Sequence, residues 1–291
     1  MMRYNSSMYS PLKHVIMKHP RDAFKSQDHL SKNWKTFNYL REPNFDEALN
    51  EFSELVNILE QQGTQIDYLP SSDTVGLDSI YAHDPVKFTP AGALILKSGK
   101  KLRQPEANVF KEFLTERGIP IIGELVGDAV SDAGDIVWLD DRTLLVGRGY
   151  RTNDEAIRQL KEMTADLVDE FIVVQLPHDQ GEEECLHLMS FLSVVDNDLA
   201  VVHSPLMPVF LRQLLLQKGF QLIEVPKKEY DTLGCNVLAI APRVCVLTNE
   251  NASTIQQLKD AGATVHVYKG QEISLLGTGG PTCLTCPVVR G

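Results

Sequence analysis

The chain has 291 residues, of which 43% are hydrophobic and 23% charged, and its formal net charge is -11 at pH 7. This length and composition are typical of a globular protein with a large core, in one or two domains. The negative charge disfavours nucleic acid and anionic membrane surfaces as partners, and it is compatible with a cationic ligand.

The five cysteines are an odd number and suggest no regular disulfide framework, which favours a reducing compartment. The N-terminal segment from Met1 to Ser10 has no apolar run of signal-peptide length. No window approaches the roughly 18 consecutive apolar residues of a membrane-spanning helix. We therefore expect a cytoplasmic protein without a membrane span.

The first part of the chain predicts a strand, a loop and an amphipathic helix. Residues 15–17 form a short apolar run that Pro20 stops. Residues 21–44 are polar and irregular, and we interpret them as a long loop. Apolar residues then recur at intervals of three and four, which predicts a helix over about 45–62, and a strand follows at 65–70.

From residue 80 onwards one pattern occurs four times: a strand, a tight turn, a second strand, a helix, a glycine and a third strand. The predicted helices span about 105–117, 153–169, 208–218 and 252–261. The spacing of roughly 35–50 residues is typical of repeat architectures.

A fifth copy of the pattern is divided between the two ends of the chain. Residues 283–289 would supply its first strand, and the strand at 15–20, the helix at 45–62 and the strand at 65–70 would supply the remainder. Joining both ends in this way closes a ring of repeats. The predicted fold is α/β, a five-bladed α/β propeller of pseudo-symmetric ββαβ repeats whose N- and C-termini share one blade. Residues 1–291 would form a single catalytic domain, and an ordinary mixed α/β sheet is the alternative.

The residues at which the repeats begin are unusual for β-strands. They are His83-Asp84, the run from Asp132 to Asp135, His187, Cys235-Asn236 and Cys283. In a radial array the same position of each repeat faces one channel, so these groups would converge. A thiol, an imidazole and carboxylates in one pocket can supply a nucleophile with acid–base assistance. The structural alternatives are a turn residue for Asp84, which precedes Pro85, and a buried core imidazole for His187.

The pair Cys283 and Cys286 has the spacing of some metal and redox sites. A zinc site would need a second close pair, which the other cysteines do not provide. A redox pair of the thioredoxin type stands at the start of a helix, whereas a strand is predicted here. The glycines from Gly277 to Gly280 lack the lysine of a phosphate loop. We expect no metal and no cofactor, and we expect Cys286 to pack in the core.

Four motifs together resemble the guanidino-group modifying superfamily, which includes arginine deiminases, dimethylarginine dimethylaminohydrolases and amidinotransferases. They are Gly279-Gly-Pro-Thr-Cys283, His187-Leu-Met-Ser-Phe, Asp132-Ala-Gly-Asp135 and Gly147-Arg-Gly-Tyr-Arg151-Thr-Asn153. The resemblance extends from Leu12 to Arg290, and it implies a five-bladed α/β propeller.

The resemblance also implies a covalent mechanism with three catalytic residues. Cys283 would attack the guanidinium carbon, and its thiolate would be favoured by the bound cation. His187 would protonate the leaving amine and then activate water against the thiouronium intermediate. Asp132 would orient the guanidinium or the imidazole.

Five further residues are expected to bind the substrate. Asp84 would hold guanidinium nitrogens through charge-assisted hydrogen bonds. Arg151 and Arg103 would hold the α-carboxylate. Asp135 and Asn236 complete the expected set.

Two departures from the family patterns leave the substrate open. Asp132-Ala-Gly-Asp135 is nearer to the motif of amidinotransferases than to the Glu-Gly-Gly-Asp of the hydrolases. Met189, two residues after the histidine, replaces an acid and matches the dimethylarginine dimethylaminohydrolase branch. The expected reaction is hydrolysis of a C–N bond of arginine or an N-methylated arginine, which gives a citrulline-like product and ammonia or an amine. An amidinotransferase and a non-catalytic guanidino-ligand binder are the alternatives. The expected partner is a small cationic guanidino substrate, and a homodimer stays open.

Overall fold

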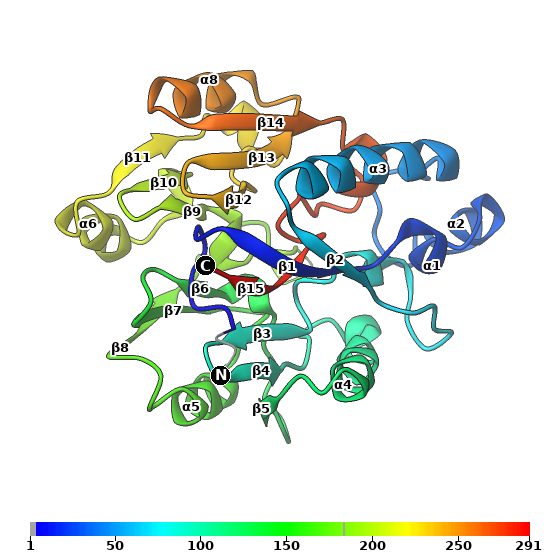
Figure 1. Cartoon of the computed structure of the whole chain (residues 1–291), viewed down its shortest axis with the longest axis horizontal. Helices are drawn as coiled ribbons and strands as arrows, with labels where there is room; N and C mark the ends of the chain where they lie inside the picture. The colour runs from blue at the N-terminus through cyan, green and yellow to red at the C-terminus, as the bar shows by residue number, and fades with distance from the viewer. Residues whose placement is uncertain (1–3, 183) are drawn as a thin grey trace.

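The computed structural model describes residues 4–182 and 184–291, and within them the strands form five sheets of three strands each (Figure 1). In every sheet the middle strand runs antiparallel to one neighbour and parallel to the other. A helix connects each parallel pair, as such a crossover requires. The fold is therefore mixed α/β, with the predicted strand–strand–helix–strand order in all five units.

Four of the units are continuous in sequence. The first contains β3 (Val86–Thr89), β4 (Gly92–Ile95), α4 (Glu106–Glu116) and β5 (Ile121–Glu124). The second contains β6 (Ile136–Trp138), β7 (Thr143–Arg148), α5 (Asp154–Met163) and β8 (Glu170–Gln175). The third contains β9 (Leu192–Asp196), β10 (Leu199–Val202), α6 (Val209–Gln217) and β11 (Gln221–Glu224). The fourth contains β12 (Leu238–Ala241), β13 (Val244–Thr248), α8 (Ala252–Asp260) and β14 (Thr264–Tyr268), and α7 (Lys227–Tyr230) precedes it.

The fifth unit joins the two ends of the chain. It contains β15 (Cys286–Arg290), β1 (Leu12–Met17), α3 (Phe45–Gln61) and β2 (Gln65–Tyr68). β15 lies antiparallel to β1, with Ile16 opposite Cys286, and β1 lies parallel to β2. Figure 1 shows the red C-terminal strand beside the blue N-terminal one. The sequence prediction that both ends share one unit is consistent with this sheet.

Each sheet contacts the next one around a closed circuit. β15 contacts β3, β9 contacts β12, β12 contacts β1, and β6 contacts the 3₁₀ turn η4 (Leu188–Ser190) that leads into β9. The remaining junction is made by Trp138, whose Nε1 donates to the Phe88 carbonyl oxygen over 3.3 Å. In Figure 1 the five long helices lie around the rim, and the first strand of each unit lies nearer the centre.

Helix α3 illustrates how the sequence specifies these elements. The Asn44 side chain accepts a hydrogen bond from the Glu47 amide over 3.0 Å, which caps the first turn. The buried apolar side chains of α3 are spaced as one helical face requires: Ala48, Phe52, Leu55 and Leu59. Gly63, with φ of +78°, follows the end of the helix.

The loop predicted over residues 21–44 is wrong in its first half. Helix α1 covers Pro20–Ala23 and α2 covers Gln27–Asn33. The Ser26 side chain caps α2 by accepting from the His29 amide over 3.2 Å. Leu30 is the one buried residue of α2, so the helix has no apolar period that a sequence pattern could reveal.

The strands predicted to begin at the reactive residues are also wrong in their bounds. The run after Asp132 and the run after His187 form the 3₁₀ turns η3 (Ala133–Asp135) and η4 before β6 and β9 begin. Cys283 lies in a turn, and β15 starts at Cys286. The reactive side chains therefore stand at the junctions that lead into the first strands. Among the described helices, none is long and apolar enough to cross a membrane.

Candidate active site

Two neighbouring cavities meet at Cys283. The described residues that line both are Thr278, Glu184, Cys185, His187 and Cys283. Their volumes are about 180 Å³ and about 320 Å³. Both exceed the roughly 30 Å³ occupied by one water in the liquid, so each can hold an organic molecule.

The amide of Asn236 holds the Cys283 side chain in place. Its Nδ2 donates to the Cys283 sulfur over 3.2 Å, while its Oδ1 accepts from the Thr282 backbone amide over 3.0 Å. A Cβ atom at Gly280 would lie 2.5 Å from the Asn236 side chain, so only glycine permits this approach. Asn236 is thus brought to the site as predicted, through a contact with the thiol itself.

The surroundings of Cys283 favour the neutral thiol. Burial and then the Asp84 charge raise its pKa to about 12, against the opposing effect of the Asn236 hydrogen bond. With no ligand bound, the sulfur therefore keeps its proton at neutral pH. Formation of a thiolate requires a positive charge to arrive in the cavity.

His187 is held from behind by Asp132. The Asp132 Oδ2 lies 3.1 Å from the His187 Nε2, and Asp132 is 1% exposed. Asp132 is not among the described residues that line either cavity, so it acts through the imidazole. Burial alone would lower the His187 pKa, but Cys185 and the Asp132 hydrogen bond raise it well above its ordinary value. The imidazole is therefore protonated near neutral pH and can act as an acid.

A glycine in η3 makes room for this imidazole. A Cβ atom at Gly134 would lie 2.5 Å from the His187 Nδ1. Nε2 faces Asp132, and Nδ1 lies 3.8 Å from the Cys185 sulfur. Gly134 also donates its amide to the Asp84 Oδ1 over 3.2 Å, so one turn positions both groups.

Arg103 binds Asp84 in this structure. Its Nη1 lies 2.5 Å from the Asp84 Oδ2, and its Nε and Nη2 lie 3.1 Å and 2.9 Å from the Glu106 carboxylate. Its Nη2 also donates to the Tyr81 carbonyl oxygen over 2.8 Å. Burial would raise the Asp84 pKa, but Arg103 and then His187 hold it well below the usual range. The geometry gives Arg103 the task of fixing an ionised Asp84, which differs from the predicted α-carboxylate contact.

Arg151 is available to a ligand. It lines the first cavity, and among the described residues its guanidinium donates one hydrogen bond, from Nη2 to the Glu184 carbonyl oxygen over 3.3 Å. The other N–H groups of the fork can take a carboxylate. The predicted contact with an α-carboxylate stays a prediction.

Asp135 does not reach the cavities. Its Oδ2 accepts from the Thr152 hydroxyl over 2.6 Å and its Oδ1 from the Leu188 amide over 2.8 Å. The side chain is fully buried, and burial raises its pKa to about 6. The predicted substrate contact is therefore replaced by an anchoring role, because Asp135 fixes the residue next to His187.

Two further residues of the cavities were not predicted. Asp78, which is 5% exposed, lines the first cavity and pairs with the Lys100 Nζ over 2.7 Å. A carboxylate between the apolar Leu77 and Ile80 was a signal that could have identified it. Cys185 lines both cavities, with its sulfur 3.8 Å from the His187 Nδ1. Its position two residues before the histidine was the only available signal.

A family model described as "N,N dimethylarginine dimethylhydrolase, eukaryotic" matches residues 20–290. The dimethylarginine dimethylaminohydrolase of Pseudomonas aeruginosa is 26% identical over 225 residues, which cover 77% of this chain and 80% of that one. The uncharacterized protein YkgA of Bacillus subtilis is 28% identical over 84% of this chain and 81% of its own. The arginine deiminase of Limosilactobacillus reuteri is 24% identical over 65% of this chain, and the match spans 56% of that enzyme.

Solved structures share the fold over nearly the whole chain. A mutant of the Pseudomonas aeruginosa enzyme in complex with citrulline has a TM-score of 0.75 at 22% identity, over 97% of this chain and 100% of that one. The N-terminal domain of ArgZ, covalently bound to a reaction intermediate, has a TM-score of 0.79 at 18% identity, over 95% and 98%. SxtG, an amidinotransferase from Microseira wollei, has a TM-score of 0.76 at 16% identity, over 100% and 98%.

The family match spans every junction that supplies the site, from Asp84 to Cys283. This family match, the similarity to a dimethylarginine dimethylaminohydrolase and the fold shared with an amidinotransferase confirm the predicted resemblance to the superfamily. The chain belongs to the N,N-dimethylarginine dimethylhydrolase family, a family of amidine C–N hydrolases within the guanidino-group modifying superfamily.

Proposed function

We propose that the protein hydrolyses a C–N bond of arginine or an N-methylated arginine, with Cys283 as the nucleophile and His187 as the acid and base. The observation that supports this most directly is that Cys283, His187 and Asp84 line the same cavity. A thiol, a protonated imidazole and the ionised Asp84 line one cavity. Relatives named for this chemistry are consistent with the proposal.

The first cavity suits a cation that carries a carboxylate at its other end. Asp84, Asp78 and Glu184 line it together with Cys283. Asp84 would accept hydrogen bonds from the guanidinium, and its position is fixed by Arg103. Arg151, whose guanidinium makes one hydrogen bond to the described part of the chain, would bind the α-carboxylate.

Binding of the cation prepares the nucleophile. A positive charge next to Asp84 opposes the effect that raises the Cys283 pKa, so the thiol releases its proton to water in the cavity. The thiolate adds to the guanidinium carbon and forms a C–S bond. Protonated His187 gives its proton to the departing nitrogen as the C–N bond breaks, which leaves a thiouronium intermediate and a neutral imidazole.

The second half of the reaction returns the residues to their starting forms. Neutral His187 takes a proton from water as the oxygen adds to the same carbon. The C–S bond then breaks, Cys283 leaves as the thiolate, and the remaining hydroxyl proton of the adduct returns to the sulfur to restore the thiol. The product is a ureido compound of the citrulline type. Asp132 stabilises the imidazolium in both halves and sets its orientation.

We further propose that the five sheets are the blades of one α/β propeller domain spanning 1–291. The closed circuit of sheet contacts supports this, together with the β1–β15 pairing. The cytoplasmic location and the homodimer stay predictions.

A product assay on a guanidine panel tests the proposed reaction. The protein is incubated with arginine, monomethylarginine and asymmetric dimethylarginine, and mass spectrometry measures the ureido product and the released amine. We expect product from at least one substrate. Cys283→Ser should abolish turnover, whereas Cys245→Ala, which removes a thiol that lines neither cavity, should retain it. Folded protein that yields no product from any guanidine, or full activity of Cys283→Ser, would refute the proposal.

The run Asp132-Ala-Gly-Asp135 favours an amidinotransferase as the second candidate. In that case the amidino group would pass to an amine instead of water. Adding glycine or another primary amine to the same assay distinguishes the two: strict dependence of turnover on the amine would establish transfer. Ligand binding without turnover under either condition would leave a guanidino-ligand binder.

A further inference from the structure

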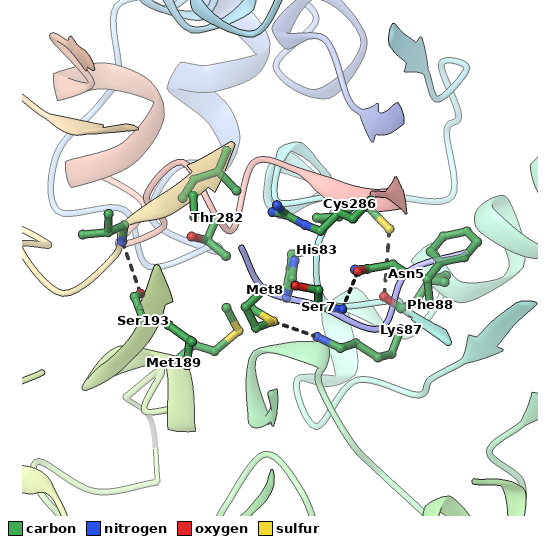
Figure 2. A pocket seen from close by; sticks show the side chains of 17 residues that line it. Asn5, Ser7, Met8, His83, Lys87, Phe88, Met189, Ser193, Thr282 and Cys286 are labelled. Atoms are coloured by element: carbon green, nitrogen blue, oxygen red, sulfur yellow. Dashed lines mark hydrogen bonds between the residues drawn. The ribbon is translucent and has the colours of Figure 1, made fainter. Parts of the chain in front are cut away.

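A third cavity lies next to the site, and its lining carries an excess of positive charge (Figure 2). His83, Met189 and Thr282 line both it and the second active-site cavity, whereas Cys283 does not line it. The N-terminal segment contributes Asn5, Ser7 and Met8. The volume is about 20 Å³, enough for a single water-sized species.

Lys87 and Arg290 both line this cavity and both are buried, at 4% and 9% exposure. None of the described residues around the cavity is an aspartate or a glutamate. Buried cations are almost always paired with an anion, because an unpaired charge in a low-dielectric interior is costly. Within residues 4–182 and 184–291, the pair therefore lacks the counter-charge that its burial requires.

The hydrogen-bond donors in the cavity are also incompletely used. The Lys87 Nζ contacts the Met8 sulfur at 3.9 Å, and a thioether is a weak acceptor (Figure 2). Arg290 donates from Nη1 to the Ser10 carbonyl oxygen over 2.7 Å, but its Nε finds no partner among the described residues. The buried Thr282 hydroxyl also has no hydrogen-bond partner among the described residues.

The pKa shifts of the two cations are consistent with the absence of a nearby negative charge in the part of the chain that the structure describes. Burial lowers the Lys87 pKa to about 7; Cys286 opposes this shift, and Arg290 adds to it with a smaller effect. Burial lowers the Arg290 pKa to about 9. Both shifts have the direction expected of cations without a nearby carboxylate.

We propose that this cavity binds a small monovalent anion of halide size, held by the Lys87 ammonium, the Arg290 Nε–H and the Thr282 hydroxyl. The anion would neutralise the buried charge and satisfy the unused donors together. The size of the cavity excludes phosphate and organic anions. The site lies behind His83, whose backbone amide donates to the Cys283 carbonyl oxygen over 3.1 Å, so the anion would support the floor of the active site.

Bromide provides a direct probe. Crystals of the full chain are soaked in sodium bromide, and anomalous differences are measured at the bromine absorption edge. We expect a peak enclosed by Lys87, Arg290 and Thr282. Density for water there with no anomalous signal, in crystals where other bromide sites are occupied, would overturn the proposal.

A thermal melt in solution provides the second readout. Chloride is exchanged for gluconate at constant ionic strength, and the wild-type melting temperature should rise by about 2–6 °C between 1 and 100 mM chloride. Lys87→Met should abolish the rise, whereas Lys161→Met, at an exposed lysine, should keep it. A wild type that ignores chloride, or equal responses in wild type and Lys87→Met, would contradict the site. If Lys87→Met does not fold, the bromide experiment decides alone. Neither readout depends on catalysis.

Discussion

Cys283 and His187 line the same two cavities, with both protons in place. Burial and Asp84 raise the pKa of the thiol and keep it neutral, and Cys185 and Asp132 raise the pKa of the imidazole and keep it charged. This differs from a thiolate–imidazolium pair that exists before substrate arrives. Reactivity of the sulfur is therefore coupled to binding of a cation, which protects the thiol from other electrophiles.

Alkylation kinetics test this proton arrangement. A Cys185→Ser variant, which removes the exposed thiol, is treated with iodoacetamide from pH 6 to 10, and mass spectrometry follows Cys283. Because the Cys283 pKa is raised to about 12, the rate should increase about tenfold per pH unit with no plateau below pH 10. A guanidinium ligand that is not turned over should accelerate the reaction at pH 7. A plateau near pH 7 without ligand would show a preformed thiolate.

Residue types and their repeat positions are the basis on which the sequence predicts the reactive groups, since a thiol, an imidazole and acids do not favour strand formation. Cys283, His187 and Asp84 do line one cavity. The sequence could not distinguish Asp132, which supports the imidazole, from Asp135, which anchors a backbone amide. That difference depends on which donor each carboxylate meets, and such contacts arise only from the packed junction.

At the scale of elements, the short junction turns position the chemistry. η3 and η4 contact each other, and the Asp135 carboxylate connects them through the Leu188 amide. These turns have too few residues for a periodic pattern, so the sequence predicted strands in their place. The predicted ends of helices α6 and α8 lie close to the observed ends, because the apolar periodicity of a helix extends over several turns.

Replacement of Asp135 tests the anchoring role. Asp135→Ala leaves the buried Leu188 amide without an acceptor, so we expect unfolding free energy to fall by about 1–3 kcal/mol and kcat to fall as His187 loses its support. Asp135→Asn keeps an acceptor for that amide, and the Thr152 hydroxyl can turn towards Ser131, 3.0 Å away. Urea denaturation and steady-state kinetics measure both effects. An alanine variant as stable and active as wild type would exclude the role.

A comparison of wild type with Asp135→Asn predicts how the free energy of unfolding changes with pH. An acid whose pKa is raised from 3.8 to about 6 on folding binds its proton more tightly in the folded state. Its contribution to stability therefore falls as pH rises from about 4 to 6 and is constant above that range. Asp135→Asn lacks this titration. The stability of wild type relative to the asparagine variant should decline over that window and then level off, and an increase would contradict the assignment.

At the scale of the whole molecule, the repeat could be predicted from the sequence because each unit has the same order of strands and one amphipathic helix. The split unit could be inferred because four complete copies left one set of elements at each end. Helix α2 could not be inferred from the sequence, since its single buried residue, Leu30, creates no periodic pattern of apolar residues. The third cavity was equally invisible, because it collects residues from the N-terminal segment, β3 and β15.

Closure of the ring should be essential for folding. A chain that ends at Thr285 lacks β15 and with it the buried Cys286 and Val288, and it leaves β1 with an open edge. We expect this chain to show no cooperative thermal transition by circular dichroism. A chain that ends at Arg290 loses only the exposed Gly291 and should melt like the full protein. A cooperative transition at the normal temperature in the shorter chain would show that the other sheets suffice.

Cys283, the proposed nucleophile, stands shortly before β15, the strand that completes the first unit to be synthesised. A chain emerging from the ribosome presents the acids and the imidazole early, but the sulfur enters the pocket only when β15 docks against β1. In the proposed mechanism, an incomplete chain therefore cannot attack a guanidino substrate. Since Asp84, Asp132, His187, Asn236 and Cys283 come from five different junctions, turnover would also report that every unit has reached its place.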